Sequence, residues 1–234
     1  MEQQQQFQIL AANETHFHFA QTICDEMAES AKARGTGIAK RTPEYIIQKM
    51  QEGKAVIALS PTNEWAGFCY IETWEGEYVA NSGLIVSLKF RKNGLARLIK
   101  HKVFELSRKK YPNAKIFGLT TGLAVMKINS ELAYEPVTYS ELTQDEAFWA
   151  GCKSCVNYEI LMSKGRSNCL CTAMLYDPKD HYEPKETKQF FEQKKTVFAR
   201  LLRFKQSKFK KERKGDINLF ATSLKFVFGH FFNF

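Results

Sequence analysis

The chain has 234 residues, of which 44% are apolar and 25% charged, a balance typical of a globular rather than a disordered protein. No stretch approaches the roughly 20 apolar residues of a membrane-spanning helix, and the N-terminus, MEQQQQFQIL, lacks the basic start and the apolar run of a secretory signal. We therefore expect a cytoplasmic protein whose six cysteines are thiols, metal ligands or catalytic groups rather than disulfides.

The net charge of +9 is concentrated in one segment. Residues 1–184 carry as many basic as acidic residues, and so do residues 215–234, so the whole excess falls within 185–214. The basic character therefore describes a C-terminal extension and not the main part of the chain. We expect one domain over 1–184 and a basic helical extension with a Phe-rich end over 185–234.

Hydrophobic periodicity and turn residues predict alternating strands and helices along the domain. In chain order we expect a strand at 7–12, helices at 17–33 and 42–53, strands at 55–60, 65–74 and 78–87, a helix at 94–112, a strand at 115–121, a helix at 124–133, a strand at 136–142, a short helix at 143–152 and a last strand at 169–177. This order favours an α/β fold with a mixed, largely antiparallel sheet and helices on both faces, because it is not a regular βαβ repeat.

A basic turn between a strand and a helix stands out in the sequence VSLKFRKNGLARL, at 86–98. A strand that ends near Val86 and a helix that begins near Gly94 leave the first amides of the helix unpaired, which makes an anion site. Gly94 lets the backbone approach a ligand closely, and Arg91 and Lys92 add positive charge. The stretch is therefore predicted to bind phosphate, and the alternative is ordinary packing of the helix on the sheet.

The spacing Arg91-x-x-Gly94-x-Ala96 resembles the acyl-CoA motif of the GNAT N-acyltransferase superfamily, R/Q-x-x-G-x-G/A. Its surroundings match as well, because strands precede it and a second helix ends in ELAYEPV, similar to the LGF or LGY ending of that superfamily. There the loop amides hold the pyrophosphate of coenzyme A and the strand pairs with pantetheine. The resemblance therefore implies contacts to acetyl-CoA or succinyl-CoA from Ile85, Val86, Arg91, Lys92, Asn93, Gly94, Leu95 and Ala96.

A narrower resemblance covers about residues 7–180. The stretches AKARGTGIAKRTPEYI, GLTTGLAVMKIN and GCKSCVNYEIL…CLCTAMLYDP are similar to short bacterial GNAT proteins assigned to N-acylglutamate synthesis, the entry step of arginine biosynthesis. This resemblance implies transfer of an acetyl or succinyl group from acyl-CoA to the amine of a small acidic amino acid, L-glutamate above all.

Acyl transfer needs a donor for the oxyanion and a fate for the leaving thiolate. The resemblance implies a strand amide near Ile85 and Val86 as the oxyanion donor. In many relatives a tyrosine protonates the thiolate, but here Asn129 holds that place, and an asparagine supplies no proton at neutral pH. We therefore expect water or another residue to protonate the thiolate, or the thiolate to leave unprotonated.

The acceptor amine must lose a proton before it attacks, so a base is needed. Glu72, on the strand expected at 65–74, is our candidate, and the alternative is a solvent-facing carboxylate. Asn81 and Ser82, on the neighbouring strand, are expected to position a water or the acceptor.

A basic loop precedes the second expected helix and carries Arg34, Lys40 and Arg41. Arginine binds carboxylates through two parallel hydrogen bonds, so these residues are candidates for binding an acidic acceptor. The alternative is a basic loop that only faces solvent.

Four cysteines, Cys152, Cys155, Cys169 and Cys171, lie in an insertion at about 143–171. Four thiolates make a closed structural zinc site, so zinc is one interpretation, beside a redox pair or buried thiols. If 156–168 were a tight hairpin, the two pairs would lie roughly 10 Å or more apart, whereas an irregular loop that doubles back would bring them together. Cys24 and Cys69 are expected in the core.

The basic segment of the extension has phenylalanine and leucine at roughly helical spacing. The functional interpretations of this segment are docking on the domain, binding to an anionic membrane and binding to nucleic acid. The favoured interpretation is a solvated helix with one packed stripe. The Phe-rich end is expected to pack on the chain or on a second subunit, which leaves a homodimer open.

We conclude from the sequence that the chain is an acyl-CoA-dependent N-acyltransferase with a small-molecule acceptor. Two alternatives stand beside it: an acyltransferase for another amine, on a protein or a small molecule, and a non-catalytic module that binds acyl-CoA or nucleic acid.

Overall fold

The computed structural model describes residues 7–35, 40–74 and 76–181. The expected extension at 185–234 lies outside these residues, so its helix, its partners and the homodimer stay predictions.

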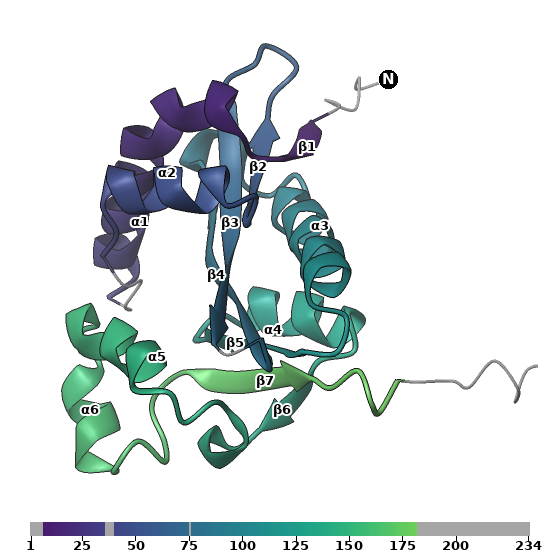
Figure 1. The fold of residues 1–234 in the computed structure, drawn as a ribbon. Coiled ribbons are helices and arrows are strands. Elements are labelled where there is room, and N and C mark those ends of the chain that lie inside the picture. The colour runs from purple at the N-terminus through teal and green to yellow at the C-terminus, as the bar shows by residue number, and fades with distance from the viewer. Residues whose placement is uncertain (1–6, 36–39, 75, 182–234) are drawn as a thin grey trace, which may run out of the picture. The chain divides into compact units, whose positions relative to one another are not determined.

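A seven-stranded sheet forms the centre of the domain (Figure 1), in the order β1-β2-β3-β4-β5-β7-β6. All neighbours are antiparallel except β4 and β5, which run parallel, so the expected mixed, largely antiparallel sheet is confirmed. The strands are β1 (Gln8–Ala11), β2 (Ala55–Leu59), β3 (Trp65–Trp74), β4 (Tyr78–Val86), β5 (Lys115–Thr120), β6 (Glu135–Val137) and β7 (Thr172–Tyr176).

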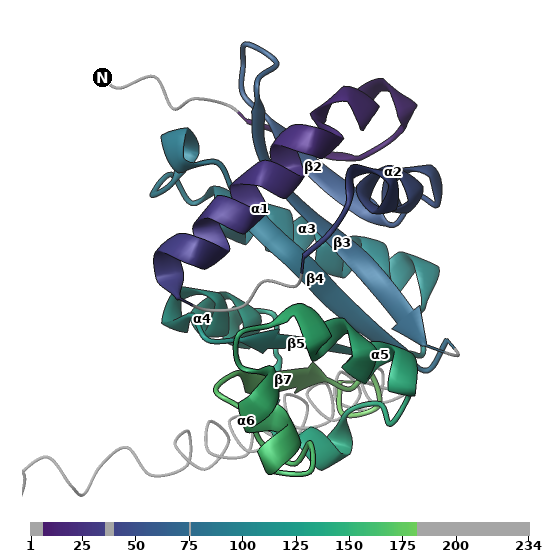
Figure 2. The same ribbon diagram turned by 90° about the vertical axis from the view of Figure 1, so that its left-hand side faces the viewer.

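Helices cover both faces of this sheet, as Figures 1 and 2 show: α1 and α2 pack on one face and α3 on the other. Each face has its own core, with Met27 and Ile46 against Phe68 on the first and Ile99 and Val103 on the second. The helices are α1 (Ala20–Arg34), α2 (Pro43–Gln51), α3 (Leu95–Lys110), α4 (Leu123–Glu131), α5 (Glu146–Ala150) and α6 (Tyr158–Ser163).

The short helix expected at 42–53 forms as α2, for the reasons read from its sequence. The hydroxyl of Thr42 accepts a hydrogen bond from the amide of Tyr45 at 3.3 Å, and Pro43 takes the first helical position. A cap hydroxyl and a proline at this position together fix where the chain enters the helix.

Two expectations were wrong in the second half of the domain. The strand expected at 136–142 stops at Val137, because Thr138 and Glu141 cap each other and turn the next residues into a 3-10 helix. The loop at 156–168 contains a short helix, α6, which the sequence does not predict. The last strand is also shorter than the expected 169–177.

The two parallel strands part soon after they begin to pair. Their ladder ends at Ala80 and Phe117, and beyond this point β4 and β5 diverge. A β-bulge lies in the same stretch of β4, because Cys69 on β3 faces two residues, Gly83 and Leu84. A bulge bends its strand and leaves the extra residue unpaired. The edge of β4 that faces β5 is therefore open over the residues after Ala80.

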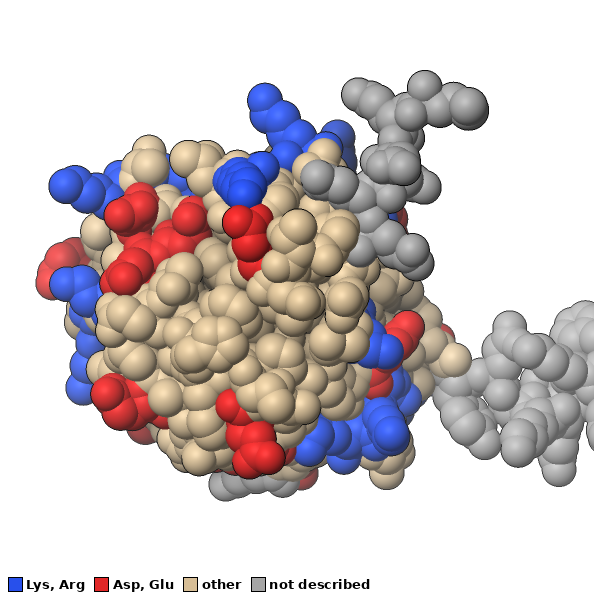
Figure 3. Space-filling view, turned by 90° about the horizontal axis from the view of Figure 1, so that it is seen from above, with Lys and Arg blue, Asp and Glu red and all other residues tan. Residues whose placement is uncertain are grey.

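Charged side chains of both signs lie around the face of the domain seen in Figure 3, whose centre is uncharged. This mixture fits the equal numbers of acidic and basic residues over 1–184. Among the residues that the structure describes, no helix is both long and apolar enough to cross a bilayer.

The bulge makes a specific prediction for Gly83, whose φ is +65°. A Cβ there would overlap the buried ring of Tyr70, so Gly83→Ala adds a clash to an unfavourable backbone conformation. We expect it to lower the free energy of unfolding by about 3 kcal/mol or more in urea titrations. Gly165→Ala is the matched control, since its φ is +54° with open space around it, and should cost about 1 kcal/mol. Equal losses would contradict the packing of Tyr70 on the bulge.

Candidate functional site

The predicted anion loop ends where α3 begins, as the sequence indicated. Gly94 caps the helix with φ at +72°, a left-handed conformation that suits glycine. Lys92 also has a positive φ, +68°, which is uncommon for a residue with a side chain. Two such residues in four turn the backbone sharply, so the first amides of α3 face outward.

A groove of about 540 Å³ lies beside this loop, between the end of β4 and α4. Seven of the eight residues predicted to contact coenzyme A line it, and Asn93 does not. Arg97, Lys127 and Glu131 add a charged rim that the sequence reading did not identify. The seven are Ile85, Val86, Arg91, Lys92, Gly94, Leu95 and Ala96.

Arg91 plays a different part in this loop from the one expected. Its Nη2 donates to Glu26 and to Ser30 on α1, both at 2.7 Å, and its Nε donates to the carbonyl of Val86 at 3.0 Å. The guanidinium thus ties the loop to α1 and to the end of β4. Its bonds hold the loop backbone in place beside the groove.

A second cavity of about 420 Å³ opens where β4 and β5 part. It shares Arg34, Leu84 and Val125 with the groove, so the two lie next to each other. Its remaining lining comes from both sides of the sheet: Arg41, Tyr70, Asn81, Ser82, Gly83, Lys100, Gly118, Leu119, Thr120, Thr121, Gly122, Asn129 and Cys171.

The lining of this cavity is positively charged. It contains Arg34, Arg41 and Lys100, and its described lining residues include no Asp or Glu. Arg41 is held by its Nε, which donates to the hydroxyl of Tyr70 at 2.7 Å. Lys40 does not line the cavity; its amide donates to Ser154 in the insertion at 3.2 Å. Of the three basic residues singled out in this loop, the structure therefore brings two to the cavity.

Glu72 lies near the cavity but does not line it. It is on β3, two residues after Tyr70 and hence on the same face of the sheet, and its carboxylate forms an ion pair with Lys49 at 3.0 Å. Burial raises the pKa of Glu72 to about 7, against the opposing charge of Arg41. The nearby Lys49 ammonium also favours the charged carboxylate. A carboxyl group with a pKa near neutrality can exchange protons at physiological pH.

Asn129 lines the cavity from α4 and is almost fully buried. Its Nδ2 lies 3.7 Å from the sulfur of Met174, a weak contact, and its Oδ1 has no hydrogen-bond partner within the described chain. A buried polar atom without a partner is costly, which marks this side chain as facing something other than protein. The expectation that Asn129 lies at the reaction centre stays a prediction.

Lys100 is the residue of the cavity that the sequence reading missed. It lies inside α3, is 2% exposed, and its Nζ donates to Oδ1 of Asn81 at 3.3 Å. Tyr134 donates to the same oxygen at 2.9 Å, and Asn81 donates through Nδ2 to Ser107 at 2.9 Å. A signal was present, since Lys100 and Ser107 fall on the apolar side of an amphipathic helix.

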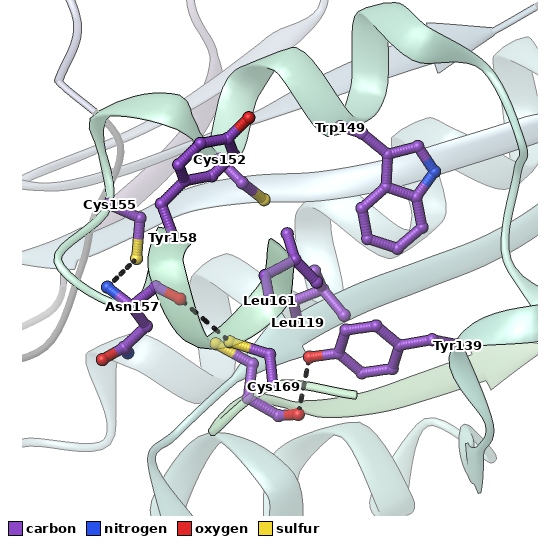
Figure 4. Close-up of a pocket in the computed structure, with 10 residues that line it drawn as sticks. Leu119, Tyr139, Trp149, Cys152, Cys155, Asn157, Tyr158, Leu161 and Cys169 are labelled. Carbon is purple, nitrogen blue, oxygen red and sulfur yellow. Dashed lines mark hydrogen bonds between the residues drawn. The ribbon is translucent and has the colours of Figure 1, made fainter. Parts of the chain in front are cut away.

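The four cysteines of the insertion line one small pocket, shown in Figure 4 together with Tyr139, Trp149, Tyr158 and Leu161. Residues 156–168 fold back through α6, so the second of the two geometries considered for this loop holds. The Sγ of Cys155 accepts from the amide of Asn157 at 3.4 Å, and the Sγ of Cys169 donates to the carbonyl of Asn157 at 3.8 Å. The thiols therefore make local hydrogen bonds.

The zinc interpretation of Cys152, Cys155, Cys169 and Cys171 is not supported. Within residues 7–35, 40–74 and 76–181, no three His, Cys, Asp or Glu side chains are placed to hold a metal ion. All four thiols are partly buried, and Cys152 and Cys169 pack against the apolar cluster that joins the insertion to β5 and β7.

Known proteins of similar sequence bear on the function of this site. No protein-family model matches the chain. A curated relative, the thialysine N-epsilon-acetyltransferase of Caenorhabditis elegans, is 27% identical over 146 residues, which is 61% of this chain and 89% of that protein.

Two solved structures share the fold. The N-acetylglutamate synthase from Neisseria gonorrhoeae, complexed with coenzyme A and N-acetyl-glutamate, aligns with a TM-score of 0.52 and 15% identity over 74% of this chain. The alignment covers only 35% of that enzyme. A Mycobacterium tuberculosis protein in complex with CoA aligns with a TM-score of 0.53 and 13% identity, over 73% of this chain and 98% of that one.

The chain has the GNAT acetyltransferase fold. The acetyltransferase relative in sequence and the solved structures with bound coenzyme A support the prediction of an acyl-CoA-dependent N-acyltransferase. Similarity to the gonococcal synthase is weak in sequence and partial in length, so the fold comparison does not identify an acceptor for this chain.

The buried ammonium of Lys100 makes stability depend on pH. Burial lowers its pKa from 10.5 to about 8, so between these values the unfolded chain binds more protons than the folded one, and stability rises with pH. Below pH 8 Lys100 is charged in the folded chain, so the full free-energy cost of burying its ammonium is present. We therefore expect Lys100→Met to raise the free energy of unfolding by about 2–3 kcal/mol at pH 7 and by much less at pH 10.5.

Urea titrations at pH 7, 9 and 10.5 measure this difference. Lys102→Met, at an exposed position of the same helix, is the control and should change little at any pH. A Lys100→Met gain that is the same at all three values would contradict a buried, charged ammonium.

Proposed function

We propose that this GNAT enzyme transfers an acyl group from acyl-CoA to the α-amine of an acidic amino acid, L-glutamate, as in the first step of arginine biosynthesis. The observation that carries the proposal is the charge of the acceptor cavity. Arg34, Arg41 and Lys100 line it, and no carboxylate is among its described lining residues. An acceptor with two carboxylates complements that charge, because arginine binds carboxylates bidentately.

The coenzyme binds in the groove beside the loop. The outward amides at the start of α3 take the pyrophosphate, which a helix N-terminus favours by its unpaired N–H groups and its dipole. Lys92 adds a charge at the rim. Pantetheine runs along the open edge of β4 beyond Ala80, and the acyl group reaches the cavity where β4 and β5 part.

The reaction follows from this placement. The amine attacks the thioester carbonyl, and an amide of the bulge at Gly83 and Leu84 stabilises the oxyanion, slightly earlier in β4 than the sequence predicted. Glu72 takes the proton of the amine through water, since its carboxylate does not line the cavity itself. Asn81 and Ser82, which do line it, orient the acceptor.

A second acceptor class is favoured by the C. elegans relative, which is named for thialysine. Such a substrate carries one carboxylate and two amines. Its second ammonium would need a negative partner, and the described cavity lining offers none. The donor is acetyl-CoA or succinyl-CoA, and the acetyl group is the one that the names of the C. elegans and gonococcal proteins contain.

The groove assignment is tested at Gly94. We expect Gly94→Glu to weaken coenzyme A binding by at least about 100-fold, because a carboxylate would meet the pyrophosphate at the mouth of α3. Gly94→Gln is the matched control, with the same size and backbone strain but no charge, and should lose about tenfold or less. Calorimetric titration with coenzyme A gives both constants, and equal losses would assign the effect to the backbone alone.

The acceptor is tested by thiol release from acetyl-CoA and succinyl-CoA with L-glutamate, L-aspartate, L-lysine or thialysine. We expect thiol release that depends on L-glutamate. The donor that gives the faster release identifies the acyl group that is transferred. Release with thialysine or lysine but not with glutamate would replace the proposed acceptor by the second class.

The carboxylate contact is tested at Arg41. We expect Arg41→Met to raise the KM for glutamate by about 10- to 100-fold, the worth of one or two charge-assisted hydrogen bonds, with the affinity for coenzyme A unchanged. Lys40→Met is the control, because that neighbouring cation does not line the cavity. A loss in the control as large as in Arg41→Met would indicate a general effect of loop charge.

A further inference from the structure

The fully buried Lys100 contributes charge to the acceptor cavity, but no chemical step is assigned to it above. Its ammonium sits between Oδ1 of Asn81, 3.3 Å away, and the face of the Tyr134 ring, whose centre is 5.1 Å away. Neither contact neutralises a charge. A buried charge is normally paired, or it faces a ligand. Because Lys100 also lines the acceptor cavity, the missing negative charge belongs to something bound there.

The groups around Lys100 do not supply that charge themselves. Cys69 on β3 is buried, and burial raises the pKa of its thiol to about 11. Burial likewise raises the pKa of Tyr134 well above its usual value. Cys171, across the cavity, has its pKa raised to about 12, and the other charged lining residues are Arg34 and Arg41. At neutral pH Lys100 therefore faces neutral or positive groups.

The acyl transfer produces a negative charge in this cavity. When the carbon–sulfur bond of the thioester breaks, the sulfur of coenzyme A leaves as a thiolate. Asn129 lines the same cavity from α4, but an amide has no proton to give at neutral pH. Gly118 on β5 packs close to this side chain, since a Cβ there would lie 3.8 Å from Nδ2 of Asn129.

We propose that Lys100 is the catalytic acid that protonates the leaving thiolate of coenzyme A. A proton passes from Nζ to sulfur as the carbon–sulfur bond breaks and the new amide bond completes. The acceptor ammonium gives its first proton to Glu72 before attack, and Glu72 releases that proton to solvent. After attack the nitrogen gives its second proton through water to the neutral Nζ, so the cycle consumes no other reactant. Asn81 is a positioning residue, because its Oδ1 fixes the ammonium. The inference rests on the proposed acyl transfer but not on the identity of the acceptor.

The acidity of the group suits this step. Burial lowers the pKa of Lys100 to about 8, close to the roughly 8.5 of an ordinary thiol. A proton donor is most effective when its pKa lies near the pH and near that of the group it protonates. An exposed lysine, more than two orders of magnitude less acidic, would hold its proton too tightly.

The test compares Lys100→Met and Lys100→Arg, with Lys102→Met as an exposed control on the same helix. Calorimetric titration with coenzyme A first shows that each variant binds. We expect Lys100→Met to lower kcat by about 100-fold or more, with the KM values for donor and acceptor within about threefold of the parent. The arginine variant keeps the charge but loses the matched acidity, and its kcat should fall by about tenfold or more.

The pH profile separates this role from a structural one. The parent kcat should fall above pH 8 as Lys100 loses its proton, whereas this alkaline limb should be absent in both variants. Unchanged kcat in Lys100→Met would overturn the proposal. A raised acceptor KM with kcat retained would overturn it as well and make Lys100 a carboxylate anchor.

A wrong assignment of the acceptor can be distinguished from a wrong role for Lys100. If the parent releases no thiol with L-glutamate, the same comparison is run with the amine that it does accept. The role of Lys100 is then tested on the cleavage of the thioester with that amine.

Discussion

The functional part of this protein depends on one constraint, the parting of two parallel strands. Once β4 and β5 stop pairing at Ala80 and Phe117, backbone groups on the open edge of β4 must find other partners. The bulge at Gly83 keeps the strand bent away, with the ring of Tyr70 packed where a side chain would lie. The opening places polar backbone at the centre of the sheet, where a ligand can pair with it.

The anion loop was predictable because local rules determine it. Gly94 follows from the need for a left-handed residue at the start of α3, and the residues around it follow in register. Thr42 and Pro43 defined α2 in the same way. The central strands were also found from their apolar runs and short connections. In each case the residues that decide the structure are neighbours in the sequence.

The cavity was harder to predict because its residues come from distant parts of the chain. Nothing near Arg91 in the sequence indicates that Glu26 on α1 will hold its guanidinium. The position of Lys100 on the apolar side of α3 was visible in the sequence. That the described residues lining its cavity include no carboxylate depends on the tertiary structure. The short helix in the insertion around Cys152 was not predicted for a related reason. Its position depends on packing against β5 and β7 rather than on a periodic pattern in the sequence.

Groove and cavity share Arg34, Leu84 and Val125, so they are not independent compartments. A molecule in the groove and a molecule in the cavity would contact the same three side chains. The free energies of binding of the two are therefore coupled, and thermodynamic linkage makes the coupling equal in both directions. An affinity of the acceptor measured on the empty protein describes a different surface from the one present when a donor is bound.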